Sequence, residues 1–420
     1  MRGCRGHLTT GRTGSDVFEG TEWIKFATIP IVAALIGYGT NWVAVKMTFW
    51  PLEFKGIKPP WLGWQGIIPS KARKMASISV DSTMSKLGNL AEIVQQMDPE
   101  QIAEHVLEHA RPLVPQQVDQ MAQRDNPVLW NALPQPVKDA VIARVQSRLA
   151  TAAHGLMQDV SQNIDQLMDM RLMVIELMAA DKRLTTRMFE ESGGPEFRFI
   201  INSGLWFGAI LGLFQMGIQI VFDAWWVLPV AGIAVGYITN WLALTLIFSP
   251  LEPRQYGPFT VQGRFLKRQA EVATVFARLV TRDILTLRNF ADHMLNGPRG
   301  DRTRALVDKH LSPIVDEALG IARPAVRLAV GSQGMESMKA ELSAKAIEMS
   351  LDPFDDPVFS AERSVIVEKT MRDRMIAMTP VEFQELLRPA FQEDELTLIL
   401  VGAFLGGLAG LAQSLFVFGV

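Results

Sequence analysis

Two asparagines, each with a polar but uncharged side chain, lie inside apolar stretches of sequence. Asn41 follows Gly-Tyr-Gly-Thr and Asn240 follows Gly-Tyr-Ile-Thr, and each is followed by Trp. A side-chain amide in an apolar window must find a hydrogen-bond partner or face water. Two interpretations are open, a structural hydrogen bond between helices or a polar pathway or lipid-headgroup site. The candidate polar seam comprises the Tyr, Thr, Asn and Trp of both motifs: Tyr38, Thr40, Asn41, Trp42, Tyr237, Thr239, Asn240 and Trp241. The two asparagines could also meet each other.

A second pattern places glycine at every fourth position and ends in glutamine. It occurs twice, as Gly204, Gly208, Gly212 and Gln215 and as Gly402, Gly406, Gly410 and Gln413. Small residues at this spacing share one helix face and allow another helix to approach closely. We predict a helix-packing stripe, with the lining of a pore or substrate path as the alternative.

Basic residues follow each asparagine motif. They are Lys71, Arg73, Lys74, Arg264, Lys267 and Arg268. Such clusters can contact anionic lipid headgroups. They are equally typical of the positively charged cytoplasmic ends of membrane helices.

Residues suited to catalysis or metal binding are sparse. His105 and His109 are four residues apart, but they lack the glutamate of an HExxH site, so surface positions are expected. Asp352, Asp355 and Asp356 form an acidic turn, and Cys4 is the only cysteine. No nucleotide-binding loop, serine-hydrolase motif or paired membrane carboxylate is present. We therefore predict no enzyme, no cofactor and no metal site.

Four long uncharged windows could position these residues. The predicted helices cover residues 24–50, of which 26–45 carry no charge, and the uncharged windows 199–222, 224–251 and 396–420. A helix needs about 20 apolar residues to cross the bilayer core. A content of 48% hydrophobic residues beside 20% charged ones fits this segregation, so four transmembrane helices are predicted.

The chain after its polar extension, residues 1–22, reads as one unit written twice, 23–222 and 223–420. Besides the two motifs, Phe-x-Pro-Leu-Glu recurs at the same offset as the asparagine motif, and a Gln-Gly turn follows it in both copies. Within each unit, two membrane helices bracket a soluble segment with helical periodicity, 70–195 and 263–393. We predict an all-α membrane protein of two tandem repeats whose helical arms pack on each other.

Two crossings return the chain to its starting side, so the two repeats should be parallel. The basic residues place both arms in the cytoplasm of a bacterium, with the protein in its inner membrane. Four basic residues before the first apolar run disagree with this orientation: Arg2, Arg5, Arg12 and Lys25. A net charge of -3 gives no reason to expect nucleic acid as a partner.

The sequence resembles a bacterial membrane-protein family catalogued as domain of unknown function 445, the YheB-like group. The resemblance rests on GYGTNWVAVKMTFWPLE, GYITNWLALTLIFSPLE, INSGLWFGAILGLFQMG and LLRPAFQEDELTLILVGAFLGGLAGLAQ, and covers the chain after about residue 23. It implies a membrane protein, but no established activity and no catalytic residues.

Two functions follow as hypotheses. The first is a non-enzymatic scaffold whose arms bind membrane lipids, a protein partner or a second copy of the chain. The alternative is a transporter or channel with a polar path between the two helices that carry the asparagines.

Overall fold

The computed structural model describes residues 22–57, 62–77, 80, 90–125, 127–222, 224–319, 323–392 and 395–418. The fold is all-α, with 85% of the structure in helices. The chain forms two compact units, each built from separate stretches of sequence. The first contains residues 1–79, 181–272 and 378–420, and the second contains residues 80–180 and 273–377. The predicted extension, apart from its last residue, lies outside the described residues.

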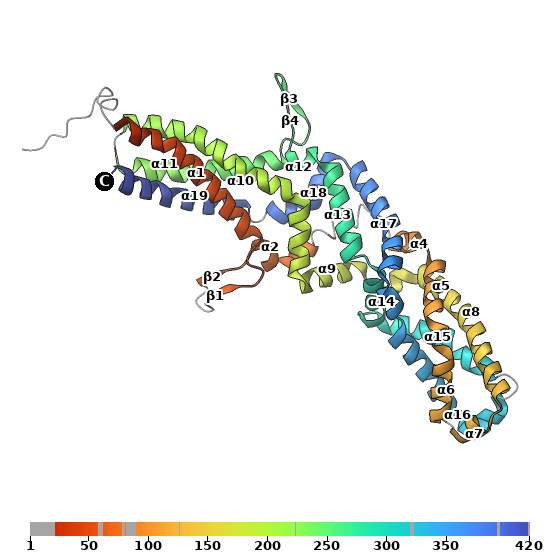
Figure 1. The fold of residues 1–420 in the computed structure, drawn as a ribbon. Coiled ribbons are helices and arrows are strands. Elements are labelled where there is room, and N and C mark those ends of the chain that lie inside the picture. The colour runs from red at the N-terminus through yellow and green to blue at the C-terminus, as the bar shows by residue number, and fades with distance from the viewer. Residues whose placement is uncertain are drawn as a thin grey trace, which may run out of the picture. The chain divides into compact units, whose positions relative to one another are not determined.

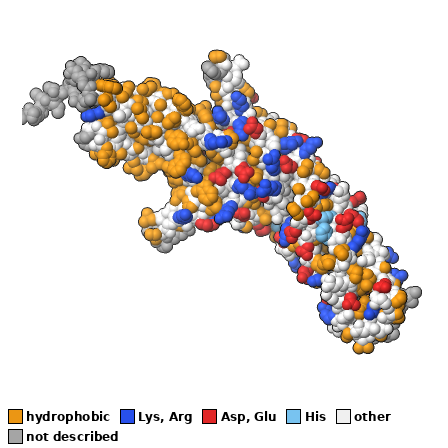
Figure 2. All heavy atoms as spheres, viewed as in Figure 1, with side chains coloured by type: hydrophobic (Ala, Val, Ile, Leu, Met, Phe, Trp, Pro, Cys, Tyr) orange, Lys and Arg blue, Asp and Glu red, His pale blue; other side chains and the backbone are white. Residues whose placement is uncertain are grey.

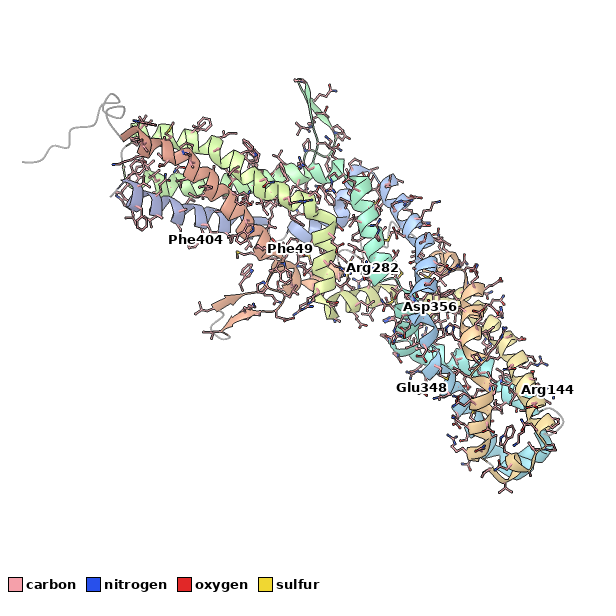
Figure 3. The ribbon with its side chains drawn as sticks, in the orientation of Figure 1. Phe49, Arg144, Arg282, Glu348, Asp356 and Phe404 are labelled. Atoms are coloured by element: carbon pink, nitrogen blue, oxygen red, sulfur yellow. The ribbon has the colours of Figure 1, made fainter. Side chains whose placement is uncertain are left out.

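The first unit contains the four predicted membrane helices. They are α1 (Glu22–Phe49), α10 (Lys182–Val221), α11 (Val227–Phe248) and α19 (Glu395–Gln413), which continues as a π-helical turn, Ser414–Phe418. Each is long and apolar enough to cross a membrane. Apolar side chains dominate the face of this bundle that Figure 2 shows, where few charged side chains lie. Phe404, for example, projects from α19 (Figure 3). The prediction of four candidate membrane helices is confirmed.

Helix boundaries differ from the predicted windows for local reasons. α10 begins well before residue 199, because Asp181 caps it by accepting hydrogen bonds from the backbone N–H groups of Arg183 and Leu184. α11 ends at Phe248 rather than at residue 251, because Pro250 cannot continue the helical hydrogen bonding.

One hydrophobic cluster joins all four helices at one end of the bundle. Phe26 and Ile29 at the start of α1 contact Leu228 at the start of α11. Met216 and Ile220 near the end of α10 pack against them, together with Phe418 after α19. The starts of α1 and α11 therefore lie at the same end of the bundle (Figure 1).

Two short β-hairpins follow α1 and α11, and the sequence analysis did not predict them. The first pairs β1 (Lys55–Ile57) with β2 (Leu62–Trp64), and the second pairs β3 (Arg254–Tyr256) with β4 (Phe259–Val261). Gly257 has a φ of 60° in the two-residue turn of the second hairpin, a conformation that favours glycine. The Gly-Pro pair at 257–258 was the available turn signal. The short helices α2 (Ile67–Ser70) and α12 (Arg264–Lys267) follow, and α18 (Pro380–Gln392) precedes α19.

The second unit is built from the two predicted soluble segments. The first supplies α4 (Leu90–Gln96), α5 (Pro99–Ala110), α6 (Val114–Asp125), α7 (Pro127–Ala132), α8 (Gln135–Leu167) and α9 (Met170–Ala180). The second supplies most of α13 (Gln269–Asp283), then α14 (Leu287–Asn296), α15 (Gly300–Leu319), α16 (Arg323–Met349), a 3-10 turn (Asp352–Asp355) and α17 (Pro357–Ala377).

The two arms pack on each other through α8 and α15. Ala152 on α8 is buried with Val307, Leu311 and Ile314 of α15. Val145, Leu149 and Leu156, also on α8, pack against the same cluster.

Polar contacts join the same two helices. Asp159 on α8 accepts a hydrogen bond from Lys309 Nζ at 2.7 Å and lies 2.9 Å from His310 Nε2. Arg148 pairs with Glu317 at 2.6 Å. Hydrogen bonds from Lys309 and His310 hold the pKa of Asp159 below its usual value.

Candidate functional site

The two asparagines of the repeated motif are buried between helices of the first unit. Asn41 on α1 is fully buried, and its Nδ2 donates to the carbonyl oxygen of Ile200 on α10 at 2.5 Å. Asn240 on α11 donates in the same way to the carbonyl oxygen of Leu398 on α19, at 2.8 Å. An unpaired amide is costly in an apolar surrounding, so each bond stabilises one helix pair.

The idea that the two asparagines contact each other is wrong, because each binds a backbone carbonyl of a different helix. The Oδ1 atom of each is buried without a hydrogen-bond partner. Both amides are therefore used within the pairs α1–α10 and α11–α19.

The rest of the predicted polar seam divides between two faces. Thr40 and Thr239 are buried, and each donates its hydroxyl to a carbonyl of its own helix. The aromatic members lie on the outside of the bundle instead: Tyr38, Trp42, Tyr237 and Trp241. The two tyrosines are each 41% exposed and the two tryptophans 47%. Only the threonines and asparagines are buried between helices.

The glycine stripes lie where the paired helices are closest. A Cβ on Gly204 would collide with the carbonyl oxygen of Gly37 and lie 2.8 Å from Asn41 Nδ2. In the second pair, a Cβ on Gly402 would collide with Asn240 Nδ2. The remaining glycines of the stripes, Gly208, Gly212, Gly406 and Gly410, also face backbone atoms of the partner helix. The stripes are therefore occupied by helix contacts, and they leave no room for a path between the paired helices.

The glutamines that end the stripes are buried as well. Gln413 Nε2 has no hydrogen-bond partner. Gln215 lines an apolar hollow of about 320 Å³ between α10 and α11, beside Trp226 and Val235. A second hollow, of about 420 Å³, lies at the end of the bundle beside Gln219 and Ser414.

The Gln-Gly turns close each hairpin onto the exit of the preceding helix. The N–H of Gly66 donates to the carbonyl oxygen of Pro51, and that of Gly263 to Pro250, both at 2.9 Å. Gln65 and Gln262 donate their side-chain amides to the carbonyl oxygens of Leu52 and Leu251. Both Pro-Leu-Glu exits begin with a cis peptide bond. The two exits thus share one local structure.

Arg268 does not fit its predicted role in headgroup contact. Its guanidinium binds both carboxylate oxygens of Glu196 at 2.7 Å, and it also pairs with Glu271. Glu196 is 2% exposed. Burial pulls the pKa of Arg268 down, but the hydrogen bonds to both glutamates outweigh it and leave this pKa raised. Arg268 therefore neutralises a buried carboxylate, and the sequence analysis missed this because Glu196 lies next to an apolar window.

The other basic residues are more open to solvent. Arg73, Lys74, Arg264 and Lys267 are exposed and Lys71 is half-buried. The guanidinium of Arg264 lies 4.4 Å from the ring centroid of Phe199. This cation–π contact still leaves the group accessible to an anion.

The two histidines of the pair lie differently in the second unit, because His109 is exposed, as expected, and His105 is not. His105 is buried, contrary to the expected surface position, because α5 packs against the segment 353–359. Its Nε2 lies 2.9 Å from the carbonyl oxygen of Pro353, and its ring stacks on Phe359. Within the described residues, no group of three or more potential ligands could hold a metal ion.

The last residue of the acidic turn, Asp356, caps α17. Asp356 accepts hydrogen bonds from the N–H groups of Val358 and Phe359 in the first turn of α17. These bonds hold the pKa of its carboxyl below the usual value. Capping therefore explains Asp356, while Asp355 pairs with Arg288.

Comparison with known proteins adds no relative, because no family model, no curated protein and no solved structure matches the chain. The resemblance to the bacterial membrane family therefore stays a prediction from the quoted motifs.

Proposed function

We propose that the protein is a multi-pass protein of the bacterial inner membrane that acts as a non-enzymatic scaffold. Its paired arms form a helical domain in the cytoplasm that binds membrane lipid or a protein partner. One observation carries the proposal: both buried motif asparagines are bound to backbone carbonyls across close glycine contacts. Such contacts serve to hold helices together.

The proposal includes two tandem repeats inserted in the same orientation. The equivalent hydrogen bonds of Asn41 and Asn240 support the repeat. The shared cluster of Phe26, Leu228 and Phe418 supports the parallel arrangement, because it gathers equivalent helix ends at one end of the bundle. The family resemblance agrees with a membrane protein that has no assigned activity.

The partner surface should lie on outward faces of the arms. Val145 and Leu149 pack in the contact between α8 and α15, so they do not belong to such a face. On α17, by contrast, Val365 is 61% exposed and Ile366 is also exposed, whereas Val367 is buried. Val358 and Ile376 are also exposed and share the helix face of Val365, and exposed apolar residues on one helix face favour binding.

The partner surface can be tested in cells with a photo-crosslinking residue placed at single positions. We expect a discrete adduct from position 365 or 366 and none from the matched buried position 367. Equal results at all three positions would contradict a partner on α17.

Transport is the alternative, and reconstitution distinguishes it. Purified protein in vesicles should dissipate potassium, sodium and proton gradients no faster than empty vesicles do. Flux that disappears in a folded Asn41→Leu, Asn240→Leu variant would overturn the scaffold and establish a path along the motif helices.

A further inference from the structure

Each of the two β-hairpins starts at the end of a membrane helix and returns to that helix end. α1 ends at Phe49 and β1 begins at Lys55, while α11 ends at Phe248 and β3 begins at Arg254. The Gln-Gly turns return each hairpin to the helix exit from which it started. The hairpins thus project from the first unit at its junction between apolar and charged surface (Figures 1 and 2).

The first hairpin presents apolar side chains where a soluble hairpin would carry polar ones. Ile57 and Leu62 are a cross-strand pair, and they are 65% and 68% exposed. An isolated two-stranded hairpin is marginally stable in water. Exposing such a pair to water gains nothing from the hydrophobic effect, so contact with an apolar phase would stabilise the tip.

The second hairpin has an equivalent cross-strand pair. In its backbone register, Tyr256 pairs with Phe259 beside the turn. Aromatic residues are the types that gather at membrane interfaces. An apolar pair in the first hairpin and an aromatic pair in the second therefore occupy equivalent places after α1 and α11, the helices that carry the asparagines.

Local contacts hold the first hairpin next to the last turn of α1. Trp64 on β2 donates its indole N–H to the carbonyl oxygen of Met47, in the last turn of α1. Trp50, directly after that helix, is 45% exposed and hydrogen-bonds to Glu190. Lys55 at the base of the hairpin is exposed. A tryptophan and a lysine at a helix end are typical of the headgroup region.

We propose that both hairpins lie in the phospholipid interface of one leaflet, with the tips between the headgroups and the acyl chains. The partner is the lipid surface itself, continuous with the apolar outside of the bundle. This inference rests on the proposed membrane insertion of the four helices. The hairpins would then act as two lateral anchors that fix the depth and tilt of the bundle.

Depth-dependent fluorescence quenching tests the proposal on the full-length chain. In a Cys4→Ser background, Ile57→Cys carries an environment-sensitive fluorophore, and the protein is placed in phosphatidylcholine and phosphatidylglycerol vesicles. Two positions serve as references: Ile210→Cys on the exposed side of α10 and Val128→Cys on α7. Quenchers are aqueous iodide and nitroxide lipids labelled near the headgroup or near the middle of the acyl chain.

We expect the label at position 57 to be quenched several-fold more by headgroup-proximal nitroxide than the label at position 128, and several-fold less by iodide. Iodide quenching at 57 equal to that at 128, with position 210 still quenched by nitroxide lipid, would overturn the interfacial hairpin alone. If position 210 also escapes nitroxide lipid, the membrane insertion fails as well. A second label at Leu62→Cys must behave like the first.

Discussion

At the scale of single residues, the closest helix contacts are made at glycines, which have no side chain. A Cβ at Gly204 would collide with the partner helix, whereas a Cβ at Gly217 on the same helix would meet nothing within 4 Å. We expect Gly204→Ala to destabilise the protein by about 1–3 kcal/mol, because overpacking forces backbone shifts. Gly217→Ala should be neutral or slightly stabilising. Thermal unfolding in detergent compares the two, and equal midpoints would argue against a close seam.

The asparagines allow a sharper test of how the bundle is held together. Each donates to a different carbonyl, so Asn41→Ala and Asn240→Ala remove independent bonds. Each loss should cost about 0.6–1.7 kcal/mol. The double variant should equal the sum of the single variants within about 0.5 kcal/mol. A larger coupling energy in unfolding measurements would mean that the two amides act together.

At the scale of elements, α8 and α15 share a contact in which the pKa of a carboxyl group is shifted. The pKa of Asp159 is lowered by hydrogen bonds from Lys309 and His310, so ionisation favours the folded state. This contribution is complete above the ordinary value of 3.8 and is lost as pH falls through the lowered pKa. The stability gap between the natural protein and Asp159→Asn should therefore close in acid. Thermal midpoints across the pH range measure it, and a constant gap would exclude the linkage.

The elements also show what could be predicted from the sequence. Length and scarcity of charge sufficed for the four candidate membrane helices, and periodicity sufficed for the helical character of the two soluble segments. The partner of Asn41 could not be predicted, because a backbone carbonyl has no residue-specific signature. The ion pair of Arg268 with Glu196 joins residues far apart in sequence, and the hairpins have strands too short to give a period.

At the scale of the whole molecule, the second unit needs both halves of the chain. Ala152 on α8 is buried by Val307 and Leu311, which come from the second half. We expect residues 1–222 expressed alone to reach the membrane with an arm that trypsin digests readily. Coexpression with residues 223–420 should restore resistance. Equal digestion in both cases would show that each arm folds independently.

The glycine contacts bear on how freely the protein's outer surface can be redesigned. Because the paired helices meet through backbone atoms, outward side chains such as Ile31, Ile210 and Phe404 take no part in pairing. These positions can be recoded for a thicker or thinner bilayer, or for a particular detergent, while the helix register is retained. The outward side chains can thus be exchanged while the contacts that hold the helix pairs together remain.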